Sequence, residues 1–405
     1  MAVHPELGLL LLLTVAALVA VLAQRLRLPY AIGLVLAGLL LGNTFVYSGP
    51  HLSRELLFLV VLPGLLFEAA YQMHFADFWR QRLSILALAV PGLLVATFLT
   101  ALLVCWGVNG LGAGSLSFIE ALVFGALISA TDPISVLAVF RTLGVERRLA
   151  VIVEAESLFN DGTAIVLFGL VLAIAGGSAL SAAGAAIEFL RVAGLAVLVG
   201  GCVGVAIGLL TRRSDDPMVG ITLTMLGAYG AFIAAELLGL SGVIACVVAG
   251  MICGTWGSQG RAGAATRGAV DAFWNYTAFL LNSFVFLLMG VEINIARLLH
   301  FLPQILVGWV AINLARASFV YGQYALMRAF GRDPWPLSWA TVLSWGGLRG
   351  GLSMVLALSL PAGFSHRELI VHMSFGVVLL TLLVQGLSMK PLLRRLGLAK
   401  EQSAD

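Results

Sequence analysis

The sequence predicts an all-α polytopic membrane protein with about 13 transmembrane helices, from its composition and from the length of its apolar stretches. Of its 405 residues, 60% are hydrophobic and 11% are charged, and the mean hydropathy is +1.04. Soluble globular domains carry about 25% charged residues, so this class is excluded. The apolar stretches do not alternate with polar residues, and an open sheet cannot satisfy its backbone in lipid. Helices are therefore expected throughout.

A transmembrane helix needs about 20 mostly apolar residues, and this length sets the predicted spans. Their boundaries hold to within a few residues, and the stretch 218–256 could be divided differently. In chain order the predicted spans are approximately 7–24, 29–47, 54–73, 84–107, 117–140, 149–175, 185–210, 218–238, 241–256, 272–293, 302–328, 336–360 and 368–393.

The lysines and arginines predict how the chain is oriented. Most of the 23 basic residues fall in alternate loops or at the C-terminal end, while the opposite loops hold only Arg54, Arg297 and Arg367. Cytoplasmic loops of membrane proteins carry an excess of basic residues. The N-terminus is therefore expected outside and the C-terminus in the cytoplasm, with residues 396–405 as a short cytoplasmic tail.

Asp132 stands in the middle of a predicted span, directly before Pro133. A charge at this depth costs at least about 2.5–3.5 kcal/mol, so it persists where it lines a cavity, pairs with a cation or exchanges protons. Proline removes a backbone donor and clashes with the carbonyl four residues earlier. We expect two half-helices here, with Thr131, Asp132 and freed carbonyls as oxygen ligands for a hard cation. The alternative is a kink capped by its own polar residues.

A second acidic segment follows on the next predicted span. Glu154, Ser157 and Asp161 lie within about 60° of one another on a helix and form one polar stripe. Glu156 and Asn160 form a second stripe, about 100–140° from Asp161. One helix thus presents an ionisable face and a hydrogen-bonding face. A purely structural role for Asp161 is the alternative.

Arg349 lies in the middle of a predicted span among four glycines, in the sequence WGGLRGG. Glycines let the backbone loosen or pack closely. An arginine cannot lose its proton, so Arg349 needs a carboxylate, and Glu156 is the predicted partner. Arg349 would then brace the site, and Asp132 and Asp161 would remain for the ion.

Glu68 lies about three-quarters of the way through its span, in LLFEAAY. Spacing leaves open whether it supports the site or belongs to a dimer interface. The histidines fall mostly in loops or at span ends, where one of them could sense pH. They are His4, His51, His74, His300, His366 and His372.

Motifs of other protein classes are missing from the sequence. No lysine follows a glycine-rich loop, so no Walker A motif supports ATP-driven transport. There is no HExxH zinc motif and no dinucleotide fingerprint, so we expect neither an enzyme nor a cofactor. A passive cation channel, which also uses acidic residues and carbonyls, and a membrane sensor remain as alternatives.

Two segments of the chain resemble each other. LPGLLFEAAYQMHF at 62–75 and NSFVFLLMGVEINI at 282–295 each lead a run of large apolar residues into a glutamate. They lie an odd number of predicted spans apart, which places two copies in opposite orientation, as inverted-repeat transporters require. Taken alone, the match could be chance.

Several motifs in one order give the chain a family resemblance. They are LLFEAAY, SATDP, EAESLFNDGTA, AELLGLSGVIACVVAG, NSFVFLLMG, WGGLRGGLS and TLLVQGLSMKPLL, spread over about residues 10–395. The chain resembles bacterial Na⁺/H⁺ antiporters of the NhaP type, in the monovalent cation:proton antiporter-1 family. The resemblance implies an inverted-repeat antiporter fold with discontinuous crossing helices, over a transmembrane domain at 1–395.

The same resemblance implies a homodimer whose transport helices move as an elevator. The core helices would be about 84–175 and 302–395, and the dimerisation helices about 7–73 and 185–293. Glu156 would pair with Arg349, and Glu68 matches a glutamate near the ion passage. Na⁺ or H⁺ would be held by polar side chains near mid-span: Asp161, Asp132, Thr131, Ser157 and Asn160.

These features together predict exchange of Na⁺ for H⁺ in a bacterial inner membrane, serving pH homeostasis. A carboxylate in hydrocarbon can be neutralised by a proton or by a monovalent cation, and the two compete. The Asn160–Asp161 pair resembles the electroneutral branch of the family, in which one Na⁺ exchanges for one H⁺. K⁺/H⁺ antiport is the alternative within the family. The expected partners are the lipid bilayer, a second copy and monovalent cations, and not nucleic acid.

Overall fold

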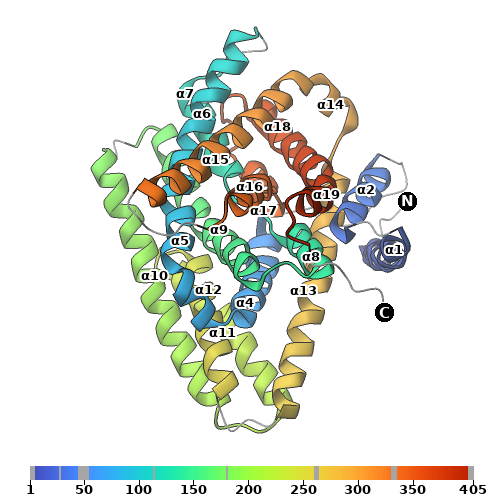
Figure 1. Cartoon of the computed structure of the whole chain (residues 1–405), viewed down its shortest axis with the longest axis vertical. Coiled ribbons are helices and arrows are strands. Elements are labelled where there is room, and N and C mark those ends of the chain that lie inside the picture. Colours follow the sequence, from blue (N-terminus) through green and yellow to red (C-terminus); the bar gives the residue numbers. More distant parts are fainter. Residues whose placement is uncertain are drawn as a thin grey trace. The chain divides into compact units, whose positions relative to one another are not determined.

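The computed structural model describes residues 5–26, 29–43, 54–112, 115–178, 181–259, 264–329 and 335–399. In these ranges every regular element is helical, as Figure 1 shows, which confirms the predicted all-α class. Seven helices of the described residues are long and apolar enough to cross a membrane, and shorter apolar helices accompany them.

The helices follow one another along the chain, and π-helical stretches (η) join some of them. In order they are α1 (Pro5–Leu26), α2 (Tyr30–Gly42), α3 (Arg54–Leu56), η1 (Leu57–Val61), α4 (Leu62–Gln72), α5 (Phe75–Ala87), η2 (Leu88–Gly92), α6 (Leu93–Gly110), α7 (Phe118–Ile128), α8 (Ile134–Leu143), α9 (Arg147–Ala175), α10 (Ala182–Thr211), α11 (Pro217–Leu237), α12 (Gly242–Gln259), α13 (Ala264–Glu292), α14 (Ile295–His300), α15 (Leu302–Ala329), α16 (Leu337–Trp345), α17 (Gly351–Leu358), α18 (Arg367–Leu380), η3 (Thr381–Gly386) and α19 (Leu387–Arg395).

In the described residues, each predicted span falls on one of these helices or on a pair of half-helices. The span predicted over 117–140 is the pair α7 and α8, and the one predicted over 336–360 is the pair α16 and α17. The stretch 218–256 divides at the turn after α11, where Gly239 has a left-handed φ of 66°. Glycine adopts this conformation at helix ends without a steric penalty.

One predicted boundary was wrong by several residues. The span predicted to begin at residue 84 belongs to a continuous helix, Phe75–Gly110. Its first turns contain Arg80 and Arg82, which lower the local hydropathy, so the apolar stretch in the sequence begins later than the helix does. Arg82 lies over the ring of the exposed Trp79, with its guanidinium carbon 4.4 Å from the ring centroid. Long side chains of this kind let an amphipathic turn extend an apolar helix.

The chain divides into two compact units. Unit 1 comprises Met1–Arg54, Val90–Val153 and Ser283–Asp405, and unit 2 comprises Glu55–Ala89 and Glu154–Asn282. This grouping reflects compactness alone. The predicted division into transport and dimerisation helices therefore stays a prediction.

Unit 1 contains helices that meet backbone to backbone. A Cβ on Gly38 of α2 would lie 2.0 Å from the carbonyl oxygen of Leu287, and a Cβ on Gly290 would lie 2.2 Å from that of Val35. The end of α13 and α2 can approach this closely because both contact positions are glycine. Small residues drive helix association in membranes in the same way.

Unit 2 is packed on the same principle. Gly250 and Gly254, four residues apart on α12, form a small-residue stripe against α4. A Cβ on Gly254 would lie 2.0 Å from the carbonyl oxygen of Tyr71, and a Cβ on Gly250 would lie 2.9 Å from that of Phe67. The stripe is a GxxxG motif, which lets two helix backbones approach closely.

Candidate ion site

The first helix break interrupts one of the predicted spans in unit 1. α7 ends at Ile128 and α8 begins at Ile134, so residues 129–133 are not helical. The break reaches back to Ser129, four residues before Pro133, where a proline ring clashes with a helical carbonyl. The predicted split into two half-helices is confirmed.

Asp132 lies in this break, where its backbone and its carboxylate are both fixed. The amide of Asp132 donates to the carbonyl oxygen of Leu348 over 2.8 Å. Its Oδ1 accepts a hydrogen bond of 3.0 Å from the amide of Ile134, the first residue of α8. The start of a helix favours a negative charge at this position. The half-buried carboxylate is thus oriented by the half-helix that follows it.

The second break lies between α16 and α17, over residues 346–350. Its backbone bonds to two other parts of unit 1. The carbonyl of Leu348 accepts from Asp132, and the amide of Arg349 donates to Oγ1 of Thr381 over 3.1 Å. The two breaks therefore lie side by side and satisfy each other's backbone groups, as a low-dielectric environment requires.

A glycine lets the second break touch the carboxylate of the first. A Cβ on Gly350 would lie 2.6 Å from both Cβ and Oδ2 of Asp132. This distance is shorter than any carbon–oxygen contact that a real side chain tolerates. The glycines of WGGLRGG thus serve close packing at this point, which is one of the two roles that the sequence allowed.

The guanidinium of Arg349 reaches the end of α7. Its Nη1 donates to the carbonyl oxygens of Ser129 over 2.5 Å and of Ala130 over 3.3 Å. The break frees these carbonyls, and a cation at a helix C-terminus also compensates the helix dipole. Because of these two hydrogen bonds, Arg349 caps the C-terminus of α7, and it does so from inside the protein, since it is only 4% exposed. Glu156, its predicted partner, belongs to unit 2, and that pairing stays a prediction.

Sequence reasoning missed a polar group on η3. Thr381 and Gln385 are buried there, and Thr381 positions the backbone of Arg349. Gln385 donates through Nε2 to Oδ1 of Asn313, whose Nδ2 donates to the carbonyl of Trp309 over 2.8 Å. The signal was present as two polar residues four apart in the apolar motif TLLVQG. π-Helical turns are frequent at functional sites.

In unit 2, one long helix carries the second acidic segment. Glu156, Ser157 and Asn160 of α9 are each 2% exposed, and Asp161 is half-buried. Nδ2 of Asn160 donates to Oε1 of Glu156 over 2.6 Å. This bond confirms that Glu156 and Asn160, four residues apart, share one face of the helix. It also shows that an amide supports the Glu156 carboxylate.

Glu68 lies near the end of α4, also in unit 2. Its Oε1 accepts from Nε2 of Gln72 over 2.5 Å, and the same nitrogen lies 2.9 Å from Oδ1 of Asn275. Asn275 is exposed on α13, while Glu68 is half-buried. A short series of polar groups therefore leads from an exposed position to Glu68.

The predicted site residues are divided between the units. Unit 1 contains Thr131, Asp132 and Arg349, and unit 2 contains Glu68, Glu156, Ser157, Asn160 and Asp161. Within unit 1, the oxygens suited to a hard cation are the carboxylate of Asp132 and the hydroxyl of Thr131. Whether the two aspartates share one ion stays a prediction.

Comparisons with known proteins agree with this architecture. The family described as "Sodium/hydrogen exchanger, transmembrane" matches residues 10–395. The chain is 40% identical to the Na⁺/H⁺ antiporter ApNhaP of Aphanothece halophytica, over 93% of this chain and 71% of that protein. It is 36% identical to the Na⁺/H⁺ antiporter NhaH of Halobacillus aidingensis, over 96% of this chain and 98% of that protein.

A solved structure shares the fold. The sodium proton antiporter MjNhaP1 from Methanocaldococcus jannaschii, determined at pH 8, superposes with a TM-score of 0.77. The match covers 95% of this chain and 97% of that chain at 21% identity. At this identity the likeness concerns the fold alone, and it confirms the predicted antiporter-type architecture.

Proposed function

The chain belongs to the sodium/hydrogen exchanger family, and we propose that it is a secondary active Na⁺/H⁺ antiporter of a bacterial inner membrane. Relatives at 40% and 36% identity are named Na⁺/H⁺ antiporters and come from bacteria. They are transporters and not enzymes, and this chain is accordingly not an enzyme. A multi-pass membrane protein is also what its apolar helices require.

The pair of helix breaks in unit 1 is the observation that carries this function. Non-helical backbone at membrane depth is tolerated where it is buried in protein or lines a water-filled cavity. Transporters place ion sites at such interrupted helices, where half-helix ends and freed carbonyls supply partial charges. Here the breaks meet at Asp132, an ionisable residue oriented by the N-terminus of α8.

In the proposed site, Asp132 and Asp161 bind the transported ion or the proton. Thr131 and Ser157 contribute hydroxyl ligands to Na⁺, and Asn160 orients the site. The hydrogen bond from Asn160 to Glu156 supports this orienting role, because it fixes the amide beside the acidic face of α9. Glu156 and Arg349 brace the site as an ion pair, and Glu68 lies along the ion passage.

Exchange follows from a single physical penalty. A negatively charged, empty site is costly to move through hydrocarbon, so only the protonated or the Na⁺-loaded form crosses. Na⁺ and H⁺ compete for the same carboxylates, and one Na⁺ exchanges for one H⁺. In this scheme the transport helices, about 84–175 and 302–395, move as an elevator in each protomer of a homodimer.

The predicted orientation completes this scheme. The basic loops face the cytoplasm, with the N-terminus outside and the C-terminus inside. Some basic residues behind this prediction, and the tail beyond residue 399, lie outside the described residues: Arg27, Arg261, Arg332 and Lys400. Cysteine labelling of a residue added after Asp405 in intact cells would test the orientation.

The function is tested with proteoliposomes that contain a pH-sensitive dye. Pulses of Na⁺, K⁺, Li⁺ and choline are added, and proton movement is followed. We expect proton movement with Na⁺ and none with choline. A response to K⁺ and not to Na⁺ would reassign the protein as a K⁺/H⁺ antiporter. Conductance in a planar bilayer without counter-transport would instead indicate a passive cation channel.

A further inference from the structure

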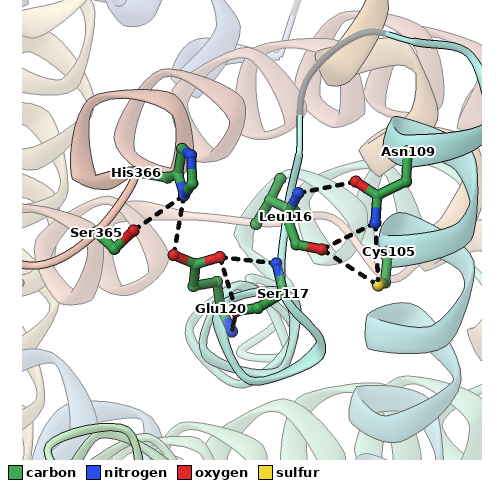
Figure 2. Close-up of polar contacts among 7 residues, drawn as sticks. All are labelled: Cys105, Asn109, Leu116, Ser117, Glu120, Ser365 and His366. Carbon is green, nitrogen blue, oxygen red and sulfur yellow. Dashed lines mark hydrogen bonds and ion pairs between the residues drawn. The ribbon is translucent and has the colours of Figure 1, made fainter.

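The two ends of unit 1 differ in how their charged side chains are paired. At the end where α7 begins, these side chains have partners within the protein, as Figure 2 shows for Glu120. Its Oε2 accepts from the amide of Ser117 over 2.7 Å, and its Oε1 lies 2.9 Å from Nδ1 of His366. Glu368, two residues after His366, pairs with Arg297 over 2.6 Å. The protein itself therefore satisfies the charges at this end.

The opposite end of unit 1 holds a cluster of basic side chains. α8, the second half of the span that α7 begins, ends there together with α19, and α9 and α16 begin there. Residues 134–148, 335–345 and 387–399 contain six basic residues and one acidic residue, Glu146. The six, which we call the basic cluster, are Arg141, Arg147, Arg148, Lys390, Arg394 and Arg395.

Contacts between the helices bring the members of the basic cluster to one level. α19 packs against both α8 and α16, and Figure 1 shows α8 beside α19. A Cβ on Gly346, directly after α16, would lie 3.5 Å from Cε of Met389 and 3.8 Å from Cγ1 of Val136. Arg141 follows Val136 by five residues, and Arg394 follows Met389 by five, which is about 7.5 Å along each helix. The two arginines therefore reach the same end of unit 1.

The start of α9 is joined to this end by an aromatic contact. The guanidinium carbon of Arg148 lies 5.4 Å from the centroid of the ring of Trp339 on α16, and Trp339 is buried. A cation over the face of an aromatic ring is attracted to it and keeps its charge. The contact holds the guanidinium of Arg148 in place, and the planar N–H groups of a guanidinium match the geometry of a phosphate.

Most of the basic cluster has no counter-charge within the protein. Among the described residues, four of its members form no ion pair: Arg141, Lys390, Arg394 and Arg395. The three arginines are exposed, and Lys390 is half-buried. Positive charges that gather without counter-charges raise the local potential and attract anions. The basic cluster is therefore suited to bind an anion from outside the protein.

The surface next to the basic cluster indicates which kind of anion fits. Val384 of η3 and Leu387 of α19 are 40% and 45% exposed, and Pro391, Arg394 and Arg395 are exposed as well. In α19, positions 387, 391, 394 and 395 recur at helical spacing and share one face. This face is apolar over its inner part and basic at its end. A phospholipid has the same profile, with an apolar chain and an anionic headgroup, whereas a free phosphate has no apolar part.

We propose that the basic cluster binds the headgroup of an anionic phospholipid of the cytoplasmic leaflet, whose acyl chain lies along Val384 and Leu387. This inference rests on the proposed function and its predicted orientation, which places this end of unit 1 at the cytoplasmic surface. Anionic lipids give that leaflet a negative surface potential, and each basic residue near the surface adds about fivefold to the affinity.

The bound lipid would act on helices that carry the ion site. α8 begins at Ile134, whose amide donates to the carboxylate of Asp132. α19 continues η3, in which Thr381 accepts from the amide of Arg349. A headgroup that bridges the ends of α8 and α19 restrains both parts from the cytoplasmic side. We therefore expect anionic lipid to order the ion site in advance and to lower the apparent KM for Na⁺.

The first test needs no transport. The Tm of the protein in detergent is measured during titration with phosphatidylglycerol, phosphatidylcholine or inorganic phosphate. The site variant combines Arg141→Gln, Arg394→Gln and Arg395→Gln. The control variant combines Arg25→Gln, Arg212→Gln and Arg213→Gln, which removes the same charge from exposed positions elsewhere on the predicted cytoplasmic side.

We expect phosphatidylglycerol to raise the Tm of wild type and of the control variant by about 1–3 °C. The site variant should need at least about tenfold more of this lipid for half of the shift, and Arg141→Gln alone about fivefold more. An ionic strength of about 0.5 M should weaken the response of wild type, because salt screens surface charges. Equal losses in the site and control variants would overturn the proposal, as would an equal response of wild type to phosphatidylcholine or to inorganic phosphate.

The second test measures transport in proteoliposomes of phosphatidylcholine with and without phosphatidylglycerol. Phosphatidylglycerol should lower the apparent KM for Na⁺ in wild type and in the control variant, and this effect should be lost in the site variant. The same response in both variants would refute the link between the lipid and the ion site. If wild type transports no Na⁺ in either bilayer, the antiport proposal fails, and the Tm titration still decides whether the lipid binds.

Discussion

Arg349 stays positively charged even when buried, and backbone carbonyl oxygens stabilise its charge. Its guanidinium donates to two carbonyls that the first break frees, and its amide is held by Thr381. The sequence suggested a carboxylate partner because a buried arginine demands one. Carbonyls at a helix end satisfy part of that demand, so the arginine stabilises the break whether or not Glu156 also binds it.

A double-mutant cycle should separate these two roles. Arg349→Ala leaves two buried carbonyls without a donor, at roughly 1–3 kcal/mol each, and should lower Tm strongly. If Glu156 is also bound, Glu156→Gln combined with Arg349→Ala should lower Tm by less than the sum of the single changes. Additive effects would mean that Arg349 acts only as a cap of α7. Tm of the detergent-solubilised protein is the measurement.

Asp161→Asn should abolish Na⁺-driven proton movement and leave folding intact. The change keeps the size of the side chain and removes the group that a proton or Na⁺ neutralises. Asp132→Asn should be nearly as severe, and Asp215→Asn, at an exposed loop position, should transport like wild type. Dye-loaded proteoliposomes report activity, and size-exclusion chromatography reports folding. Full activity of Asp161→Asn would refute its proposed role.

Single residues were predictable where one physical rule acted alone. Asp132 was identified because a charge in an apolar span is costly, and the stripe of Glu156 and Asn160 because of helical spacing. Gln385 and Thr381 were missed, because one amide or hydroxyl side chain lowers the mean hydropathy of an apolar stretch only slightly. Their roles depend on hydrogen-bond partners that lie far away in the sequence.

At the scale of elements, the two breaks act as one structure. Each break leaves backbone groups without a helical partner, and the other break supplies one. The carbonyl of Leu348 accepts from the amide of Asp132, and the guanidinium of Arg349 donates to the carbonyl of Ser129 at the end of α7. The first break was predictable because Pro133 is a local cause. The second was predicted only as a loosened or closely packed stretch, since glycines permit a break without requiring it.

Gly350→Ala tests whether the close contact of the breaks matters. The added Cβ would lie 2.6 Å from Oδ2 of Asp132, so a break or the carboxylate must shift. Overpacking of this kind costs about 1–3 kcal/mol, and we expect a lower Tm together with a raised KM for Na⁺. Gly322→Ala on α15 is the control, because its Cβ meets nothing within 4 Å. A normal KM in Gly350→Ala would mean that Asp132 tolerates displacement.

The π-helical stretches could not be read from the sequence. η2 contains Pro91 and lies inside the continuous helix Phe75–Gly110. η3 contains Thr381, whose Oγ1 accepts a hydrogen bond from the amide of Arg349. A hydropathy profile shows only an apolar stretch at both places and does not distinguish a π-helix from an α-helix. An inserted residue in a helix changes which side chains face inward, and this depends on tertiary contacts that spacing rules do not contain.

For the whole molecule, competition between Na⁺ and H⁺ gives a quantitative expectation. If both ions need the same deprotonated carboxylates, the apparent KM for Na⁺ should rise about tenfold per pH unit on the acid side of the site's titration. The maximal rate at saturating Na⁺ should change much less. Initial rates at symmetrical pH values in proteoliposomes provide the measurement. A KM that does not depend on pH would mean separate sites for the two ions.

If one Na⁺ exchanges for one H⁺, no net charge crosses the membrane and transport should not depend on the membrane potential. A mechanism that moves one net charge would change its driving force by about 2.3 kcal/mol per 100 mV of membrane potential. Exchange of one Na⁺ for one H⁺ moves none, so the rate should stay the same when a K⁺ gradient with valinomycin sets the potential to either sign. The prediction rests on the resemblance of the Asn160–Asp161 pair to the electroneutral branch of the family. A rate that follows the potential would instead require a second proton per cycle, and then the search for its carrier would begin with Glu68, a half-buried carboxylate of unit 2 that bonds to Gln72.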